Sequence, residues 1–274
     1  MSEMPGSGAY RVAAIQTVSG PDPEQNMARI ARLVAEAAGA GAQLIALPEY
    51  FALMSPDERA KVAARERDND GPIQDFLRET ARRNGVWLIG GTVPLECPDP
   101  ERVFNSCLVF DDRGERVARY DKMHLFGFSK GDEHYDESQT IMAGREVVNF
   151  EAPCGHVGLS VCYDLRFPEL YRALGRVELI VVPAAFTYTT GSAHWEVLLR
   201  ARAIENQCYV LAPAQGGRHP GGRRTFGDSM IIDPWGEVLA RRAEGDGVVI
   251  ADMEPERLAS VRASLPALQH RKIH

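Results

Sequence analysis

The chain has 274 residues, of which 45% are hydrophobic and 25% are charged. These proportions are typical of a globular protein with a packed core and exclude an intrinsically disordered chain. Lysine and arginine number 31 against 38 aspartate and glutamate residues, so the formal net charge is −7. This acidic balance argues against a protein held on nucleic acid or on an anionic membrane by bulk charge.

The sequence shows no sign of a membrane span or an export signal. No stretch approaches the roughly 18 consecutive apolar residues that cross a bilayer, and the first eight residues form no basic, apolar leader. The five cysteines are an odd number without a Cys-x-x-Cys pair, which disfavours a disulfide framework or a structural zinc site and leaves room for a reactive thiol. We therefore expect a cytoplasmic protein.

Strands and helices alternate from the start of the chain. Short apolar runs rich in β-branched residues predict buried strands, and apolar residues three and four apart predict helices between them. The turn sequence Asp111-Asp112-Arg113-Gly114 predicts a hairpin. The elements expected in this half are a strand at 10–16, a helix at 26–38, a strand at 44–47, a helix at 72–84, a strand at 86–89 and paired strands at 103–110 and 115–120.

The second half continues the same alternation after one long polar segment. Residues 126–144 contain glycine and are long for a connection, which favours a functional loop. The elements expected after it are strands at 156–161, 178–182, 209–211, 229–232 and 248–250, with helices at 168–174, 193–206 and 255–264. Because no linker or repeat interrupts the pattern, we predict a flexible N-terminus at 1–9 and one α/β domain at 10–274.

Three reactive side chains directly follow predicted strands, where open α/β sheets place their ligands. They are Glu49, Lys122 and Cys162. Taken singly, each has a structural interpretation: a solvated turn carboxylate, a surface lysine and a buried inert thiol. Together they form a coherent set, because a cysteine nucleophile needs a base and a nearby cation. Lys122 and the backbone N–H of Tyr163 would also stabilise the negative oxygen of a tetrahedral intermediate.

Three segments that contain these residues resemble the catalytic signatures of the nitrilase, or carbon-nitrogen hydrolase, superfamily. They are Leu-Pro-Glu-Tyr-Phe (47–51), Tyr-Asp-Lys-Met-His-Leu-Phe (120–126) and Gly-Leu-Ser-Val-Cys-Tyr-Asp-Leu-Arg-Phe-Pro-Glu-Leu (158–170). The similarity extends through residues 193–207, 228–236 and 269–271 and so covers essentially the whole chain. The segments 184–186, 193–207 and 214–219 most resemble the branch that acts on deaminated glutathione, and next the ω-amidases that act on α-ketoglutaramate.

The resemblance implies an α/β fold with four layers, the αββα sandwich of the nitrilase type, and a Glu-Lys-Cys triad in a pocket. By motif, Glu49 would be the general base, Lys122 the cation that stabilises the oxyanion and Cys162 the nucleophile. Many members carry a second glutamate between the lysine and the cysteine. We assign to Glu137 this role of orienting Lys122 and the substrate amide, with Glu133 as the competing candidate.

The reaction implied is hydrolysis of a small anionic amide to a carboxylic acid and ammonia, through a thioester on Cys162. Glu49 would take the thiol proton, return it to the leaving nitrogen and then activate water. Neither a metal nor an organic cofactor enters any step, and the partners expected are the amide substrate and water, without nucleic acid or membrane.

An anionic substrate requires cations in the pocket despite the acidic total. The candidate substrate-binding residues are Tyr163, Arg166 and Phe186. A guanidinium grips a carboxylate through two parallel hydrogen bonds, which suits Arg166, although a structural salt bridge with Glu169 or Asp164 explains this arginine equally well.

The sequence is also compatible with other functions. The superfamily also includes carbamoyl and nitrile hydrolases. A papain-like hydrolase would use His124, His194 or His219, a metal enzyme would use His194 and Glu196, and a binding module would carry a vestigial triad. The resemblance further implies a homodimer or higher homo-oligomer formed through the second helical layer, and the helix at 193–206 is apolar on more than one face, as burial on both sides requires.

Overall fold

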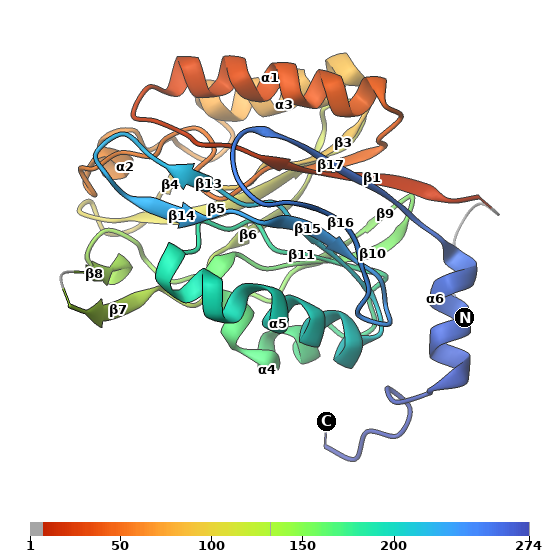
Figure 1. The fold of residues 1–274 in the computed structure, drawn as a ribbon. Coiled ribbons are helices and arrows are strands. Elements are labelled where there is room, and N and C mark those ends of the chain that lie inside the picture. Colours follow the sequence, from red (N-terminus) through yellow and green to blue (C-terminus); the bar gives the residue numbers. More distant parts are fainter. Residues whose placement is uncertain (1–7, 132, 274) are drawn as a thin grey trace.

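The computed structural model describes residues 8–131 and 133–273. Two β-sheets pack face to face between two layers of helices (Figure 1). Helices α1 (Pro23–Gly39) and α3 (Pro72–Asn84) cover the outer face of one sheet, and α4 (Pro168–Ala173) and α5 (Tyr188–Asn206) cover the other. The predicted α/β class and four-layer αββα sandwich are therefore confirmed. The predicted flexible segment 1–9 lies almost entirely outside the described residues.

The first sheet combines parallel and antiparallel strands. Its order is β17 (Gly247–Met253), β1 (Tyr10–Gln16), β2 (Leu44–Ala46), β3 (Trp87–Ile89), β5 (Val103–Phe110) and β4 (Val93–Glu96), with β6 (Arg116–Asp121) also paired to β5. Strands β1, β2 and β3 are parallel, whereas β5 runs against β3 and β6 runs against β5. Strand β6 therefore runs in the same direction as β2, and both end at the same edge of the sheet.

The second sheet has a parallel centre and antiparallel edges. Its order is β16 (Val238–Arg242), β15 (Ser229–Ile232), β12 (Tyr209–Ala212), β11 (Leu179–Val181), β10 (Gly155–Leu159) and β9 (Asn149–Ala152). Two further hairpins pair β13 (Gly216–Arg218) with β14 (Arg224–Phe226) and β7 (Gly127–Lys130) with β8 (Glu133–Asp136). Short helix α2 (Ala60–Ala63) and helix α6 (Pro255–Ser264) complete the fold.

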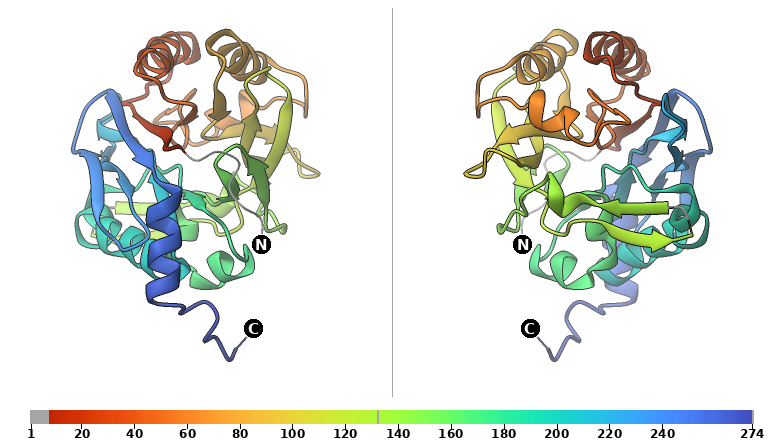
Figure 2. Two further views of the ribbon diagram at one scale, coloured as in Figure 1. Left: turned by 90° about the vertical axis from the view of Figure 1, so that its right-hand side faces the viewer. Right: turned by 90° about the vertical axis from the view of Figure 1, so that its left-hand side faces the viewer.

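Two apolar clusters hold the four layers together. The inner faces of the two sheets share one cluster, in which Val12 and Leu44 of the first sheet join Val157 and Val181 of the second. A second cluster lies between the first sheet and its helices, which stand side by side in the end-on views (Figure 2). Strands β2 and β11 are thus buried along their whole length, as their continuous apolar sequences predict.

Two predicted helices begin earlier than expected because of their N-caps. Helix α1 starts at Pro23, where the Asp22 side chain accepts hydrogen bonds from the next two free N–H groups. Helix α5 starts at Tyr188 instead of residue 193, because Thr187 caps it by accepting from the N–H of Thr190. This extra turn places Thr187 and Thr190 beside Cys162.

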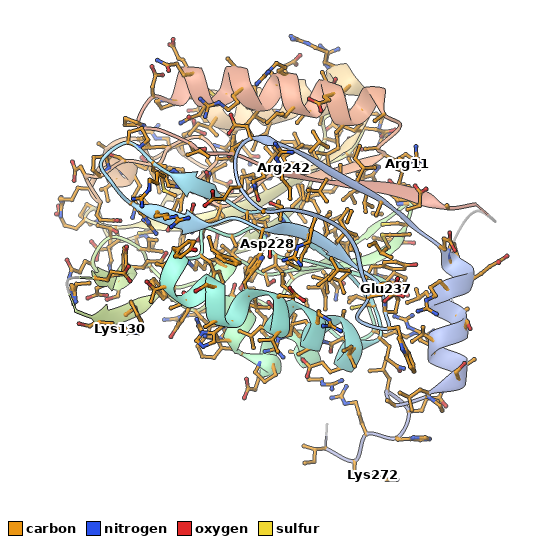
Figure 3. All side chains as sticks on the ribbon, in the orientation of Figure 1. Arg11, Lys130, Asp228, Glu237, Arg242 and Lys272 are labelled. Carbon is orange, nitrogen blue, oxygen red and sulfur yellow. The ribbon has the colours of Figure 1, made fainter. Side chains whose placement is uncertain are left out.

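The expected loop at 126–144 is largely ordered into the β7–β8 hairpin and a 3-10 turn at Glu137–Gln139. Lys130 marks the outer end of β7 at the edge of the molecule (Figure 3). This hairpin was not predicted from the sequence, because its strands are short and mostly polar. Among the described residues, no helix is long and apolar enough to cross a membrane.

A tight turn after β3 supports the segment that carries Glu49. Gly91 has φ +53°, and a Cβ atom added there would lie 2.1 Å from the carbonyl oxygen of Pro48. The next residue, Thr92, accepts a hydrogen bond from the N–H of Tyr50 at 2.9 Å. Any side chain at position 91 must therefore displace the backbone on one side of Glu49.

We predict that Gly91→Ala lowers the free energy of unfolding by about 2–4 kcal/mol, because backbone strain and a steric clash act together. Gly85→Ala is the matched control, since Gly85 has φ +60° with no atom near the added Cβ. It should cost only the left-handed penalty of about 1–2 kcal/mol. Urea denaturation measures both values, and equal losses would show that the contact with Pro48 is relieved without cost.

Candidate active site

Glu49 lies at the end of the segment that follows β2 and is 1% exposed. Its Oε1 accepts hydrogen bonds from Lys122 Nζ and Asn105 Nδ2, both at 2.9 Å, and its Oε2 accepts from the backbone N–H of Ala185 at 3.0 Å. The thiol of Cys162 lies close enough to this carboxylate for each group to influence the pKa of the other. Glu49 is therefore held by groups from both sheets, with the sulfur in its immediate surroundings.

Lys122 follows β6 and is completely buried. Its Nζ donates to Glu49 Oε1 at 2.9 Å and to Glu137 Oε1 and Oε2 at 2.9 and 2.7 Å. Its backbone is fixed on both sides, because its N–H donates to the carbonyl of Asn105 and its own carbonyl accepts from Gly144. The ammonium group thus sits between two carboxylates in a site closed to solvent.

The second glutamate of the site is Glu137, in the 3-10 turn after β8. Besides Lys122, it accepts hydrogen bonds from the hydroxyl of Tyr50 at 2.9 Å and from the backbone N–H of Phe126 at 2.7 Å. Glu133, the competing candidate, instead accepts from Thr189 at the start of α5. The structure thus brings Glu137 to the lysine and leaves Glu133 at the edge of the site.

Cys162 begins a 3-10 turn, Cys162–Arg166, just after β10. Its φ is +49°, a left-handed value that is rare outside glycine and often marks functional sites. Its N–H donates to the carbonyl of Pro183 at 2.9 Å, whereas the next N–H, that of Tyr163, has no acceptor among the described residues. This turn exposes a free N–H donor next to the sulfur.

The two carboxylates of the site have pKa values that are shifted in opposite directions. Burial raises the pKa of Glu49, and although Lys122 opposes this, the nearby charge of Glu137 reinforces it. Burial would also raise the pKa of Glu137, but Lys122 and the N–H of Phe126 outweigh it, so the pKa of Glu137 is lowered. Burial would lower the pKa of Lys122, yet Glu137 and Glu49 together raise it. Glu137 therefore stays ionised beside the ammonium, and Glu49 is the carboxylate suited to accept a proton.

The thiol of Cys162 is protonated at rest. Burial raises its pKa well above the ordinary value, Glu49 raises it further, and Lys122 only partly opposes them. The charge of Lys122 does not outweigh these effects, because two carboxylates already neutralise the lysine. The sulfur must therefore lose its proton to Glu49 as it attacks.

The expected substrate-binding residues gather around the sulfur. Tyr163 and Phe186 line a small cavity with Cys162, Phe126, Ala185, Thr187 and Thr190. The guanidinium of Arg166 lies 5.7 Å from the ring centre of Tyr163 and 5.6 Å from that of Phe186. Arg166 contacts His194 Nδ1 at 3.2 Å and forms no ion pair with Glu169 or Asp164. Its guanidinium thus packs beside two of the residues that line the cavity.

The alternative catalytic groups lie elsewhere. His124 is bonded to Asp164, His219 lies between Ser19 and Thr225, and His194 touches Arg166. None of them is a hydrogen-bond partner of Cys162 in the described part of the chain. Glu196, the other proposed metal ligand, pairs with Arg200 and Arg241 instead. Cys107, Cys154 and Cys208 are also buried, and all three belong to the apolar cluster shared by the two sheets.

Sequence reasoning missed two side chains and two backbone groups of this site. Asn105 and Tyr50 hold the carboxylates of Glu49 and Glu137, and the N–H groups of Ala185 and Phe126 complete them. Asn105 had a usable signal, since it is a polar residue inside the apolar strand 103–110. The backbone donors had none, because any residue supplies the same N–H.

Comparison with known proteins shows which family this chain resembles. The carbon-nitrogen hydrolase family model matches residues 11–263. A relative from Yersinia enterocolitica named deaminated glutathione amidase is 42% identical over 266 residues, which are 95% of this chain and 92% of the relative. The C. elegans NitFhit structure superposes with a TM-score of 0.88 at 36% identity, covering 97% of this chain and 66% of that one, just under two thirds of its length. A Nesterenkonia amidase with the acetamide moiety of fluoroacetamide on its active-site cysteine has a TM-score of 0.81 at 27% identity, covering 99% and 97%.

The pairing of Lys122 with Glu137 generates a prediction about pH. Because an ionised Glu49 is the base, activity should fall in acid with a midpoint above the ordinary value of 4.5 for this carboxyl. In Glu137→Gln the lysine pairs with Glu49 alone, which lowers the pKa of Glu49. The acidic limb of kcat/KM should therefore move to lower pH, and the plateau should fall about 100-fold as the lysine loses its second anchor.

Glu133→Gln is the matched control, because it removes a carboxylate from the same hairpin without touching Lys122. Its pH–rate profile should keep the wild-type acidic limb. A shift in Glu133→Gln together with an unchanged limb in Glu137→Gln would reverse the assignment of the second glutamate.

Proposed function

The chain belongs to the carbon-nitrogen hydrolase family and is an amidase by that kinship, and we propose that it hydrolyses deaminated glutathione by way of a thioester on Cys162. The observation that carries the mechanism is the buried ion pair of Glu49 with Lys122, beside a Cys162 thiol close enough to influence the pKa of Glu49. These groups supply a base, a cation and a nucleophile within one site. Glu137 orients the lysine.

Acylation begins when the Cys162 sulfur attacks the amide carbon and its proton passes to Glu49. The carbonyl oxygen becomes negative and is stabilised by Lys122 Nζ and by the free N–H of Tyr163. Glu49 then returns the proton to the amide nitrogen, the carbon-nitrogen bond breaks and an amine leaves. The acyl group remains on the sulfur as a thioester.

Deacylation uses the same carboxylate in the same role. Glu49, ionised again, takes a proton from water as the water oxygen attacks the thioester carbon. The carbon-sulfur bond breaks, the sulfur recovers the proton and the carboxylic acid leaves. Because one carboxylate accepts and returns the proton in both halves, a pKa above that of an ordinary glutamate suits it.

The chemistry of the substrate decides which product to measure. Glutathione is a tripeptide whose amide bonds join amino acids, so cleaving one of them releases an amine and not ammonia. The ammonia expected from the sequence applies to a primary amide such as α-ketoglutaramate, the substrate of the ω-amidase alternative. Both compounds carry carboxylates, and Arg166 at the rim of the cavity supports recognition of either.

We predict that the protein releases an amine and a keto acid from deaminated glutathione, and that Cys162→Ala does not. Acid quenching of the wild type during turnover should trap the acyl group as a mass increase on the peptide containing Cys162, and Glu49→Gln, which lacks the base needed for acylation, should show no such increase. Retention of activity in Lys122→Ala would contradict the mechanism. Faster release of ammonia from α-ketoglutaramate would favour the ω-amidase alternative.

Arg166→Met tests the recognition of the carboxylate. It should raise KM for the anionic amide about tenfold or more, because a hydrogen-bonded charge is lost. A neutral amide, propionamide, is the matched control and should react at the same kcat/KM in both proteins. An equal loss on both amides would show that Arg166 supports the fold and not the substrate.

The outer face of α5 supports the proposal of a homodimer. Val197 is 61% exposed and Ile204 is 48% exposed, one heptad apart on the same helix face. Trp235, 55% exposed, belongs to the turn before β16, whose Gly236 lies against Ile204. Asp228 lies beside this face, where it pairs with Arg241 (Figure 3). An apolar patch with a charged rim is typical of a protein interface.

Ile204→Asp should therefore shift the protein from dimer to monomer at micromolar concentration, as measured by light scattering after gel filtration. Val117→Asp is the control, because Val117 is similarly exposed on β6 of the other sheet. A dimer that survives Ile204→Asp, or a monomeric wild type, would refute this interface.

The cysteines support a cytoplasmic location. All five are free thiols, and unpaired cysteines are typical of proteins from reducing compartments. This location also suits an enzyme whose nucleophile is a thiol, because an oxidising compartment would inactivate it.

A further inference from the structure

Asp164 lies two residues after Cys162, and its side chain is completely buried. Its carboxylate accepts four hydrogen bonds. Oδ2 accepts from the Tyr120 hydroxyl at 2.6 Å and from the N–H of Val161 at 2.8 Å, and Oδ1 contacts the N–H and the ring Nδ1 of His124 at 2.9 and 2.7 Å. Because the four acceptor positions of a carboxylate are all used, none is left for a substrate.

The partners of Asp164 flank the catalytic lysine. Tyr120 precedes Lys122 by two residues and His124 follows it by two. The imidazole of His124 also stacks on Phe167, directly after the turn of Cys162, with ring centres 3.8 Å apart and planes 7° from parallel. Both sides of Lys122 are therefore tied to the turn that carries the nucleophile.

This connection crosses from one sheet to the other. Lys122 follows β6 of the first sheet and Cys162 follows β10 of the second, so no strand ladder fixes their separation. Asp164 bonds to Val161, which precedes the nucleophile, and to the two residues around the lysine. A hydrogen-bonded link at this point sets the position of Lys122 relative to Cys162.

We propose that Asp164 is a positioning residue, which holds Lys122 in register with Cys162 and so acts on the rate of the chemical step and not on substrate binding. The proposal rests on the catalytic roles given above to Lys122 and Cys162. A displacement of about 1 Å in a reacting group costs up to about 100-fold in rate. The stabilisation that Lys122 gives to the developing oxyanion depends on their separation and is therefore sensitive to such a shift.

Tyr120→Phe is the sharpest test, because it removes one hydroxyl from the link and keeps the buried ring. Tyr171→Phe is the matched control. Tyr171 is equally buried and lies near the same turn, but its hydroxyl bonds to Ser160 and not to Asp164. With the amide turned over by the wild type, Tyr120→Phe should lower kcat about tenfold with KM unchanged, whereas Tyr171→Phe should keep kcat within about twofold.

A second measurement does not depend on the identity of the substrate. We expect iodoacetamide to alkylate Cys162 through its thiolate, a form that the charge of Lys122 favours. The alkylation rate should fall several-fold in Tyr120→Phe and stay at the wild-type value in Tyr171→Phe. If the wild type hydrolyses no amide, the proposed function fails, but this comparison still tests the link. Equal alkylation in Tyr120→Phe and wild type would overturn the positioning role.

Asp164→Asn provides a stronger perturbation, since an amide nitrogen cannot accept from the backbone N–H groups that now meet the carboxylate. Where circular dichroism shows a folded protein, its kcat should fall further than that of Tyr120→Phe. A folded Asp164→Asn with wild-type kcat, or a loss that appears only in KM, would also overturn the proposal.

Discussion

The site depends on one buried ammonium group shared between two carboxylates. Removing a charge from water is costly, and the attraction between charges compensates only when geometry and hydrogen bonding are good. Lys122 satisfies this condition through Glu49 and Glu137, each of which also accepts hydrogen bonds from neutral donors. Without the lysine, two negative charges would be buried side by side.

Lys122 is bound more strongly by Glu137 than by Glu49, and the two carboxylates have different functions. Glu137 receives two of its hydrogen bonds and Glu49 receives one. Burial favours a higher pKa in both carboxylates, but Lys122 and the N–H of Phe126 outweigh it at Glu137, whose pKa is lowered, while the pKa of Glu49 stays raised. Two chemically identical side chains thus acquire different tasks, one as a fixed anion and the other as a proton carrier.

The neutral thiol follows from the same arrangement. In a cysteine-histidine pair, a cationic partner stabilises the thiolate before substrate arrives. Here the positive charge is already neutralised, so burial and Glu49 keep the Cys162 thiol protonated. Lys122 stabilises the site most when negative charge develops on the substrate oxygen. An interaction that is stronger in the transition state than in the bound substrate accelerates the reaction, whereas one that is equal in both only tightens binding.

Much of this site could be predicted from the sequence, because open α/β sheets place their functional groups just after the ends of strands. Glu49, Lys122 and Cys162 each follow a strand, and a reactive group in that position is readily noticed. The hairpin that carries Glu137 to the lysine was missed, since strands of four largely polar residues lack a strong periodic signal. The family resemblance already favoured Glu137 over Glu133 as the partner of Lys122, and the way the hairpin folds back gives the physical reason, because it brings Glu137 to the lysine and Glu133 to Thr189.

The sequence alone did not predict how the two sheets are placed against each other. Residues Glu49, Lys122 and Glu137 come from the first sheet and its following hairpin, whereas Cys162 and the N–H of Ala185 come from the second. The sequence of each strand shows where that strand ends. The distance between the ends of strands in different sheets depends instead on how the apolar cluster between the sheets packs. Because packed cores resist continuous deformation, the distance from base to sulfur is a property of the entire sandwich. The catalytic geometry is therefore distributed through an apolar core, while its chemistry is confined to a few side chains.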